Sequence, residues 1–309
     1  MSENFHVAVA GATGQLGLRI ARELMALGAD ITLLLRSAKQ ANDLVGVIPG
    51  ARVCIVDFSE GRSLEEALRG VSTVVSAVNG LEPVIIEAQT ALAKAAYEAG
   101  VKRFIPSDFA VDFRGLKSDG TNRNLDLRRE FSHRLENIPL QATSILNGAF
   151  LDMLTGQMPI ILFGIRRVLC VGRPNQKFDF TTIDDTARFT ARAALDNNAP
   201  RWLKIAGDQI SPEELVEILS DLSGKEFKLL RPMGLNTFDK MITITKAITP
   251  TSTAIYPAWQ GMQYLRDMSS GAVAMQGLDN DRYGNLKMRS AKELLSSYLK
   301  GQEPVIKFA

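Results

Sequence analysis

Three glycines near the N-terminus have the spacing of a phosphate-binding turn. Gly11, Gly14 and Gly17 follow the apolar run Val7–Ala10 and precede a helix-like segment at residues 15–27. Between a strand and a helix, such glycines permit a tight turn, let backbone N–H groups reach a phosphate and let the helix lie close to the strand. The helix start adds unpaired N–H donors and a positive dipole end. The motif predicts a dinucleotide pyrophosphate site; the alternative is a glycine-rich turn without a ligand.

The end of the second predicted strand, residues 31–35, indicates which dinucleotide binds. An NAD site usually carries an acidic residue there, which bonds the ribose 2′-hydroxyl. This chain instead has Arg36, with Lys39 close behind. A guanidinium can hold a 2′-phosphate through two parallel hydrogen bonds. Arg36 and Lys39 therefore favour NADP(H) over NAD(H), unless both are simply solvated surface charges.

The composition is that of an ordinary globular protein and excludes several classes. The chain has 309 residues, 46% hydrophobic and 23% charged, and its net charge of +2 argues against a nucleic-acid binder. No apolar run reaches about eighteen residues, so no membrane span is expected. Cys54 and Cys170 show neither disulfide nor metal-ligand spacing, and we expect no metal site. We expect a cytoplasmic monomer or homodimer that acts on a small molecule or on a protein partner.

The elements that must position these residues alternate between strand and helix. Strands are predicted at residues 7–10, 31–35, 52–56, 73–78, 102–105 and 140–145, and helices at 15–27, 63–69, 83–99 and 125–136. Ser63 and Glu66 predict a capping box for the second helix. Residues 112–124 are polar and aperiodic, which indicates a mobile surface loop. The alternation is typical of an α/β fold with a doubly wound parallel sheet of the Rossmann type.

The second half of the chain has shorter segments punctuated by prolines. Helices are predicted at residues 184–195 and 212–222, the latter with a capping box at Ser211. We expect a Rossmann domain at residues 1–150 and a smaller C-terminal substrate lobe at 151–309, with some segments returning to the sheet. Several residues of this lobe could line a substrate pocket, although their spacing is also that of a packed core: Met233, Phe238, Met241, Tyr256, Trp259, Met262 and Tyr264.

Several motifs resemble one known family. They are GATGQLG at residues 11–17, Arg36 after the second strand, AKAAYEAGVKRFIPSDF at 93–109, IPLQATSILNGAF at 138–150 and the segment 180–187. Together they resemble the NmrA-like group, an atypical branch of the short-chain dehydrogenase/reductase superfamily that includes isoflavone and phenylcoumaran benzylic ether reductases. The resemblance spans residues 5 to about 230 and thins in the C-terminal quarter.

This resemblance implies cofactor contacts at the carboxyl ends of the strands, where ligands bind in such sheets. It places residues beside the pyrophosphate, the 2′-phosphate, the adenine, and the ribose and nicotinamide. The pyrophosphate would lie beside Thr13, Gly14, Gln15 and Leu16, and the 2′-phosphate beside Arg36 and Lys39. The adenine would lie beside Asp57 and Phe58. The ribose and nicotinamide would lie beside Ser76, Ala77, Val78, Pro106, Ser107, Asn147 and Phe150. Asp57, Phe58 and Phe150 are equally well explained as ordinary turn or core residues.

The usual proton-transfer residues of this superfamily are missing from their expected places. The spacing Tyr-x-x-x-Lys occurs at Tyr283 and Lys287, far down the chain among turn residues, and we interpret it as coincidence. The resembling reductases use a lysine on the helix predicted here at residues 125–136. This chain has Arg128 at that position, and an arginine stays protonated, so it can orient a carbonyl but is a poor acid or base.

Further polar residues near the predicted site are candidates for catalysis. Ser107 can hydrogen-bond a substrate carbonyl. Asp108 can act as a base if it is buried, although it could equally cap the next turn. His133 is five residues from Arg128 and therefore not on the same helical face, so we expect a surface histidine. The predicted catalytic set is Ser107, Asp108 and Arg128.

Two functional classes remain open at this level. The leading interpretation is an NADPH-dependent reductase of the isoflavone-reductase-like type, acting on a small apolar carbonyl, enone or aromatic substrate. The alternative is a non-enzymatic NADP(H)-binding sensor that regulates a protein partner, which the missing lysine supports. A sugar-nucleotide epimerase ranks last, because it would require the Tyr-x-x-x-Lys pair.

Overall fold

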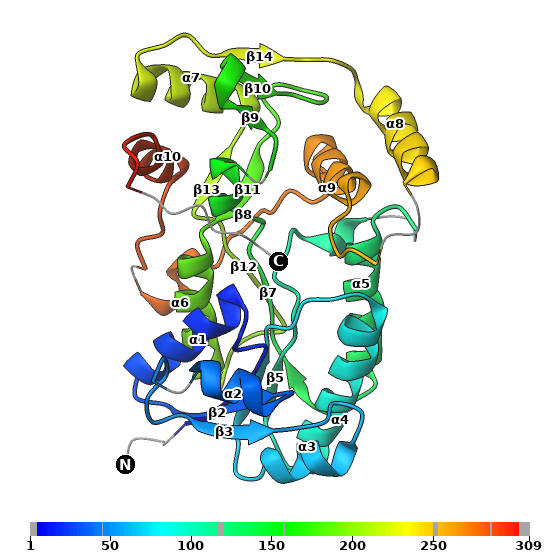
Figure 1. The fold of residues 1–309 in the computed structure, drawn as a ribbon, viewed down its shortest axis with the longest axis vertical. Helices are drawn as coiled ribbons and strands as arrows, with labels where there is room; N and C mark the ends of the chain where they lie inside the picture. Colours follow the sequence, from blue (N-terminus) through cyan, green and yellow to red (C-terminus); the bar gives the residue numbers. More distant parts are fainter. Residues whose placement is uncertain are drawn as a thin grey trace.

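A six-stranded parallel sheet lies at the centre of the computed structural model, which describes residues 5–302 except 45, 117–119, 157, 250–252 and 285 (Figure 1). The strand order is β3-β2-β1-β4-β5-β6, so it reverses on either side of β1. The strands are β1 (His6–Ala10), β2 (Asp30–Leu35), β3 (Arg52–Ile55), β4 (Thr73–Ser76), β5 (Arg103–Ile105) and β6 (Gln141–Ala142). Because every pair is parallel, all six carboxyl ends meet at one edge of the sheet.

Helices cover both faces of this sheet, because successive side chains of each strand point to opposite faces. On one face, Val7 and Val9 of β1 share a hydrophobic cluster with α1 and α6. On the other, Ala8 and Ala10 share a cluster with α3, α4 and α5. These helices are α1 (Gln15–Ala26), α2 (Ala38–Leu44), α3 (Gly61–Ala67), α4 (Gln89–Glu98), α5 (Arg123–Glu136) and α6 (Ile183–Ala194). A π-helical turn, η1 (Pro83–Ala88), leads into α4.

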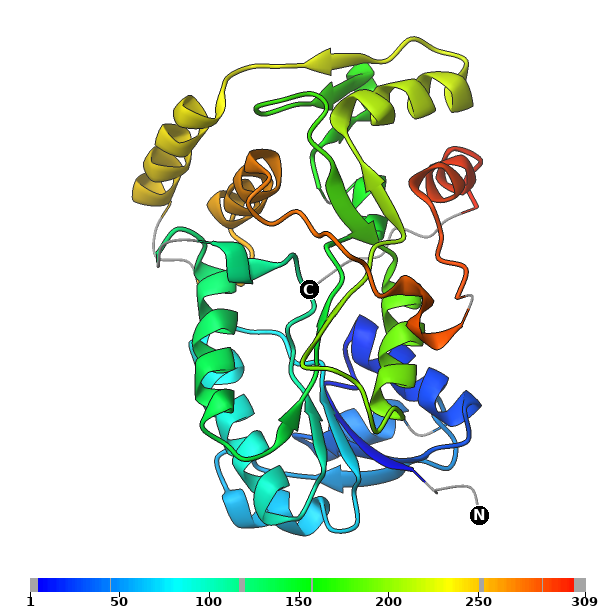
Figure 2. The ribbon, with the colours of Figure 1, turned by 180° about the vertical axis from the view of Figure 1, so that it is seen from behind.

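The second half of the chain adds a strand beside the segment that follows β6 and also builds a separate layer. β12 (Trp202–Lys204) pairs in parallel with β7 (Ser144–Leu146), which follows β6 after one residue. Two three-stranded sheets, β13-β11-β8 and β14-β10-β9, lie away from the N-terminal strands (Figures 1 and 2). Their strands are β8 (Ala149–Phe150), β9 (Ile161–Leu162), β10 (Arg167–Leu169), β11 (Phe178–Thr181), β13 (Asp208–Ile210) and β14 (Lys228–Leu230). The helices of this part are α7 (Pro212–Ser223), α8 (Leu235–Ile248), α9 (Ala258–Ser270) and α10 (Ala291–Leu299).

The doubly wound parallel sheet predicted from the sequence is confirmed, whereas one helix cap was placed wrongly. α3 begins at Gly61 with Glu60 as its N-cap, so Ser63 lies inside the helix and caps nothing. The capping box predicted at Ser211 of α7 is present. Within the described residues, no helix is both long enough and apolar enough to cross a membrane.

The segment predicted as a surface loop at residues 112–124 is anchored in the interior by three of its described residues. Phe113, Asn122 and Asn124 are buried. Asn122 accepts a hydrogen bond from the Leu125 N–H at the start of α5. Arg114, Gly115 and Gly120 are exposed, as expected of a surface loop. The buried residues were not predicted, because a polar residue can be buried when its side chain is hydrogen-bonded, which composition alone does not reveal. Residues 117–119 of this loop lie outside the described residues.

Candidate dinucleotide and substrate site

The turn after β1 is shaped so that only glycine fits at two positions. Gly11 has a φ of +82°, and a Cβ built there would lie 2.4 Å from the Ala77 carbonyl oxygen. A Cβ on Gly17 would lie 2.3 Å from the Gly11 carbonyl oxygen. Both distances are far inside van der Waals contact. The chain therefore turns tightly, and α1 lies directly against the end of β1.

The start of α1 is open to an anion. Gly14 is the N-cap, no side chain caps the helix, and its first turn contains no acidic residue. Thr13, Gly14 and Gln15 are exposed, and Leu16 is half-buried. The first N–H groups of a helix lack intrahelical partners and carry a partial positive charge. This geometry fits a phosphate without any side chain having to move.

Arg36 directly follows β2 and is exposed, as is Lys39 in α2. The Arg36 backbone N–H donates to Gln40 Oε1 at 2.9 Å, which fixes the turn that carries the guanidinium. Asp57, at the exit of the neighbouring β3, accepts hydrogen bonds from the Ser59 hydroxyl and N–H at 2.6 and 2.8 Å. The Ser59 hydroxyl, followed by the Ser59 N–H, lowers the pKa of Asp57. Phe58 is half-buried against the hydrophobic cluster of α3 and α4.

The ends of β4 and β5 carry the residues predicted beside the nicotinamide. Ser107 is buried; its hydroxyl donates to the Val78 carbonyl at 2.6 Å, and its N–H donates to Gln89 Oε1 at 3.0 Å. Pro106 is buried and Ala77 is half-buried. The Ser107 hydroxyl is therefore already used to join the two strand ends. Sequence reasoning missed Gln89, which no motif marks.

Two buried polar side chains at this sheet edge have unused hydrogen-bonding capacity. Ser76 is fully buried, and its Oγ has no hydrogen-bond partner among the described residues. Asn147 is also fully buried, and neither Oδ1 nor Nδ2 has a partner in the described part of the chain. Phe150, nearby in sequence, is half-buried in β8. Buried polar groups are nearly always hydrogen-bonded in native proteins, so these two are available to a ligand.

Asp108 and Arg128 are both buried, and each has an unpartnered atom among the described groups. Asp108 Oδ2 accepts from the Ser144 hydroxyl at 2.7 Å, while Oδ1 has no partner there. Burial raises the pKa of Asp108, against the opposing effects of Ser144, Arg128 and Arg201. Arg128 Nη1 donates to the Asn124 carbonyl at 2.9 Å, while its Nε has no partner among the described residues.

The electrostatic partners of Arg128 include two tyrosines of the second half. Burial opposes its charge, but Tyr264, Tyr256 and Asp108 together raise the pKa of Arg128, and the guanidinium hydrogen-bonds the Tyr256 hydroxyl. That hydroxyl also donates to Asn79 Oδ1 at 3.1 Å. Burial raises the pKa of Tyr264. Sequence reasoning placed Tyr256 in a possible pocket but gave it no partner, because the contact joins distant segments.

Other candidates lie outside this group. His133 is 65% exposed, with Nδ1 3.7 Å from Glu136 Oε2, as expected of a surface histidine. Tyr283 donates to Asp196 Oδ2 at 3.0 Å, and Lys287 pairs with Glu293 at 3.0 Å, so the two side chains serve different contacts. Phe238 and Trp259 are buried, as members of a core rather than an open pocket would be.

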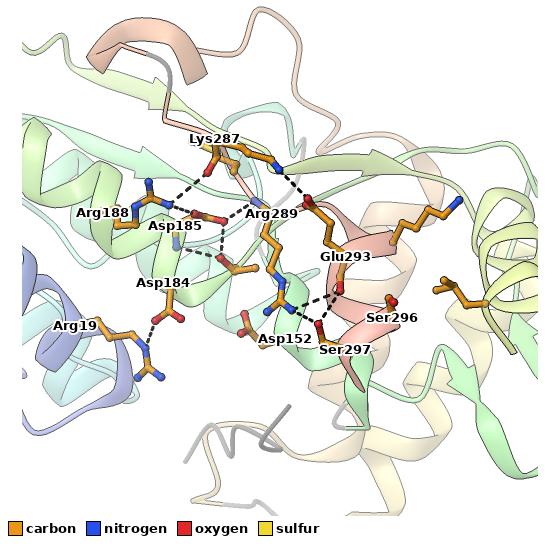
Figure 3. A pocket seen from close by; sticks show the side chains of 14 residues that line it. Arg19, Asp152, Asp184, Asp185, Arg188, Lys287, Arg289, Glu293, Ser296 and Ser297 are labelled. Atoms are coloured by element: carbon orange, nitrogen blue, oxygen red, sulfur yellow. Dashed lines mark hydrogen bonds and ion pairs between the residues drawn. The ribbon is translucent and has the colours of Figure 1, made fainter. Parts of the chain in front are cut away.

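A cavity of about 880 Å³ lies between α1, α6 and α10, and none of the predicted cofactor residues lines it (Figure 3). Its walls are mostly charged, and several of these charges are paired. Arg19 pairs with Asp184 at 2.5 Å and Arg188 with Asp185 at 2.9 Å. This polar cavity therefore lies apart from the predicted cofactor residues.

The doubly wound sheet, the glycine cradle and the open helix start define a dinucleotide-binding protein of the Rossmann class. Comparison with known proteins then identifies its family. The model of the NmrA-like family matches residues 3–258, and the chain belongs to this family. The resemblance seen in the motifs is thereby confirmed.

Named relatives and solved structures agree with this family. Pinoresinol reductase 1 of Arabidopsis thaliana is 32% identical over 247 residues, which cover 74% of this chain and 77% of the relative. Bifunctional pinoresinol-lariciresinol reductase 2 of Thuja plicata is 28% identical and covers 97% and 100%. A structure of AtPrR2 with NADP+ and (+)pinoresinol has a TM-score of 0.80 at 24% identity, covering 96% of this chain and 100% of that one. At 24% identity this last likeness shows the fold alone.

Proposed function

We propose that this chain is an NADPH-dependent reductase of the isoflavone-reductase-like type. The observation that carries the proposal is the cradle at Gly11 and Gly17 beside the uncapped start of α1, with Arg36 exposed at the end of β2. The relatives support it, since they are named as reductases and AtPrR2 was solved with NADP+. NADPH would supply the hydride, which side chains cannot provide.

The chain's own residues would hold the cofactor along the sheet edge. The N–H groups at the start of α1 would bind the pyrophosphate, and Arg36 with Lys39 would bind the 2′-phosphate. Ser76 and Asn147 would bind the nicotinamide end, because their buried polar atoms have no partner among the described residues. Leaving such a group unbonded costs about 1–3 kcal/mol, which a bound ligand would recover.

The substrate that we propose is a small, largely apolar carbonyl, enone or aromatic compound. The relatives support an aromatic substrate, because they are named for pinoresinol and lariciresinol. Arg128 would act on the substrate indirectly. It is buried and permanently charged, so it can hold and polarise the groups around the substrate oxygen but cannot supply a proton.

One observation favours a second candidate, an NADP(H)-binding sensor without turnover. Arg128 stands where the resembling reductases have a lysine, and Ser107 and Asp108 are both buried and bonded to other parts of the chain. A sensor needs the cofactor site but no proton donor. The two candidates therefore share the residues of the cradle and differ only in chemistry.

Calorimetric titration with NADPH, NADP⁺, NADH and NAD⁺ tests the proposal and separates the candidates. A reductase is expected to bind NADPH well ahead of NADP⁺ and to oxidise it in the presence of pinoresinol, an aromatic ketone or an enone. Similar binding of the oxidised forms, with weak NADPH binding and no oxidation, would favour the sensor. Absence of binding by all four nucleotides would overturn both.

A further inference from the structure

The Tyr256 hydroxyl is held at the sheet edge where the proposed function places the nicotinamide. Tyr256 belongs to the segment before α9, yet its hydroxyl donates to Asn79 Oδ1 at 3.1 Å. Asn79 directly follows Val78, whose carbonyl accepts from Ser107 at 2.6 Å. The tyrosine thus reaches across from the second half of the chain to the ends of β4 and β5.

The start of α5 fixes the backbone that carries this tyrosine. Arg123 Nη2 donates to the Ile255 carbonyl at 2.6 Å and to the Ala254 carbonyl at 3.1 Å. Asn124 Nδ2 donates to the same Ile255 carbonyl at 3.1 Å. Three hydrogen bonds therefore hold the two residues before Tyr256. The backbone before Tyr256 has no regular secondary structure, so the Arg123 guanidinium and the buried Asn124 amide fix its position.

Arg128 lies against the hydroxyl oxygen of Tyr256 and orients the hydroxyl. The guanidinium hydrogen-bonds the Tyr256 oxygen, and an arginine can only donate, so it occupies a lone pair of that oxygen. The hydroxyl hydrogen is thereby directed outward, where Asn79 Oδ1 now accepts it. The buried positive charge of Arg128 also lies beside the oxygen on which negative charge would form during proton transfer.

The other proton carriers of this region are poorly placed for the same task. The Ser107 hydroxyl is committed to the Val78 carbonyl. Asp108 is 1% exposed and bonded to Ser144. His133 is 65% exposed on α5 and lies beside Glu136. Tyr256 is 46% exposed, so a substrate can reach it, and its hydroxyl oxygen hydrogen-bonds the buried Arg128 guanidinium.

We propose that Tyr256 is the proton donor of the reaction, a catalytic role that rests on the proposed function, with Arg128 and Asn79 as its positioning residues. The substrate oxygen takes the place of Asn79 Oδ1 as acceptor. The O–H bond of Tyr256 breaks, and a new O–H bond forms on the substrate oxygen. In a carbonyl or enone substrate this oxygen carries the electron pair left when its double bond to carbon is reduced, and in a cyclic ether such as pinoresinol it carries the pair left when its single bond to carbon is reductively broken. The resulting tyrosinate is stabilised by Arg128 and regains its proton from water.

The Tyr256→Phe variant tests this role, with Tyr97→Phe as its matched control. Tyr97 is 44% exposed, against 46% for Tyr256, and lies near the end of α4 away from the site. Removal of a proton donor is expected to lower kcat by about 100-fold or more. NADPH affinity should stay within about twofold in both variants, because the hydroxyl is not among the cofactor groups.

A second readout does not depend on turnover. The protein is labelled with ¹³C at the tyrosine ring carbon that bears the hydroxyl, loaded with NADP⁺, and titrated separately with pinoresinol, acetophenone and chalcone. The resonance that is missing from Tyr256→Phe should move with at least one probe, and that of Tyr97 should not. If the Tyr256 resonance stays fixed with all three probes, the hydroxyl does not meet a substrate oxygen and the inference is wrong.

The outcomes for the two proposals can be told apart. If wild-type protein oxidises NADPH with a substrate and Tyr256→Phe keeps its kcat within a few-fold, the reductase stands and the role of Tyr256 is overturned. If wild-type protein binds no nucleotide, the proposed function fails before Tyr256 is tested. A lowered kcat with unchanged NADPH affinity and a moving Tyr256 resonance supports both.

Discussion

At the residue scale, burial separates the groups that are free to bind from those already used inside the protein. Arg36 is exposed at the end of β2, where an anion can reach it. Ser107 and Asp108, predicted as catalytic, are buried and bonded to Val78 and Ser144. Polar residues predicted for one site therefore differ widely in what they can bind. Their roles follow from their surroundings rather than from their residue types.

Replacing Arg36 with glutamate tests the cofactor preference. We expect Arg36→Glu to weaken NADPH binding by about 2–3 kcal/mol, or roughly 30- to 150-fold, while NADH binding is spared. The substitution replaces charge-assisted hydrogen bonds to a 2′-phosphate by repulsion. Calorimetric titration measures both affinities. Arg62→Glu, at an exposed position of α3, controls for the change in net charge. An unchanged preference would remove Arg36 from the site.

Replacing Asp108 with asparagine tests its burial through pH dependence. Burial raises the pKa of Asp108 in the folded protein, so between its ordinary value near 4 and the raised value the folded state binds more protons than the unfolded state. Stability contributed by the neutral form is therefore lost as pH rises through this window. The introduced asparagine cannot ionise, and its amide oxygen can still accept a hydrogen bond from Ser144. The free energy of unfolding of Asp108→Asn, relative to wild type, should rise as pH increases above about 4.

Urea unfolding between about pH 4 and 8 measures this difference. Asp221→Asn, at an exposed position of α7, controls for the loss of one carboxylate. If the free energy of unfolding of Asp108→Asn relative to wild type stays constant or falls as pH rises, Asp108 is ionised in the folded protein with little loss of stability. Its positive neighbours Arg128 and Arg201 would then outweigh its burial.

At the element scale, the contact between α1 and β1 is what builds the cofactor cradle. Gly17 faces the Gly11 carbonyl so closely that no side chain fits between them. Gly261, inside α9, has open space around the position of a Cβ. The two glycines thus share a helical backbone but differ in their surroundings. Only the first is required by packing.

Alanine substitutions at these two helical glycines should act in opposite directions. Gly17→Ala is expected to lower stability by about 1–3 kcal/mol, because α1 must move off the strand. It should also weaken NADPH binding by about tenfold or more, since the helix start moves with it. Gly261→Ala should raise stability by up to about 1 kcal/mol, because alanine is the better helix former. Thermal unfolding and calorimetry check both; equal effects would contradict the close contact.

At the scale of the whole molecule, the two halves of the chain share one core. Phe189 of α6 and Leu203 of β12 lie in the same hydrophobic cluster as Val7 and Ile20. α6 packs along α1 (Figure 1). We propose a cofactor domain of residues 1–150 completed by these returning segments, with most of residues 151–309 forming the substrate lobe.

The shared core predicts that residues 1–150 do not fold alone. Such a fragment would expose the face of β1 and α1 that α6 covers, and a domain needs its own closed core. We expect the fragment to show no cooperative urea transition by circular dichroism, and co-expression with residues 151–309 to restore one. A cooperative transition of the isolated fragment would contradict the shared core.

Local signals allowed much of the fold and part of the site to be predicted. The strand and helix alternation, the cradle of Gly11, Gly14 and Gly17, and the box at Ser211 follow from period and turn chemistry, which act over a few residues. The cap at Ser63 failed because the chain already enters α3 at Gly61. The individual contacts to NADP(H) remain predictions.

The sequence by itself determined the doubly wound class, the tight glycine turn before α1 and the family, because each depends on residues close together in the chain. Only the tertiary structure decided that Tyr256 reaches Asn79 and Arg128. It also decided that Asn147 is buried with its amide unpartnered among the described residues. The contacts of Tyr256 join segments more than a hundred residues apart. Their geometry is set by how the halves pack together, and no local pattern in the sequence records that packing.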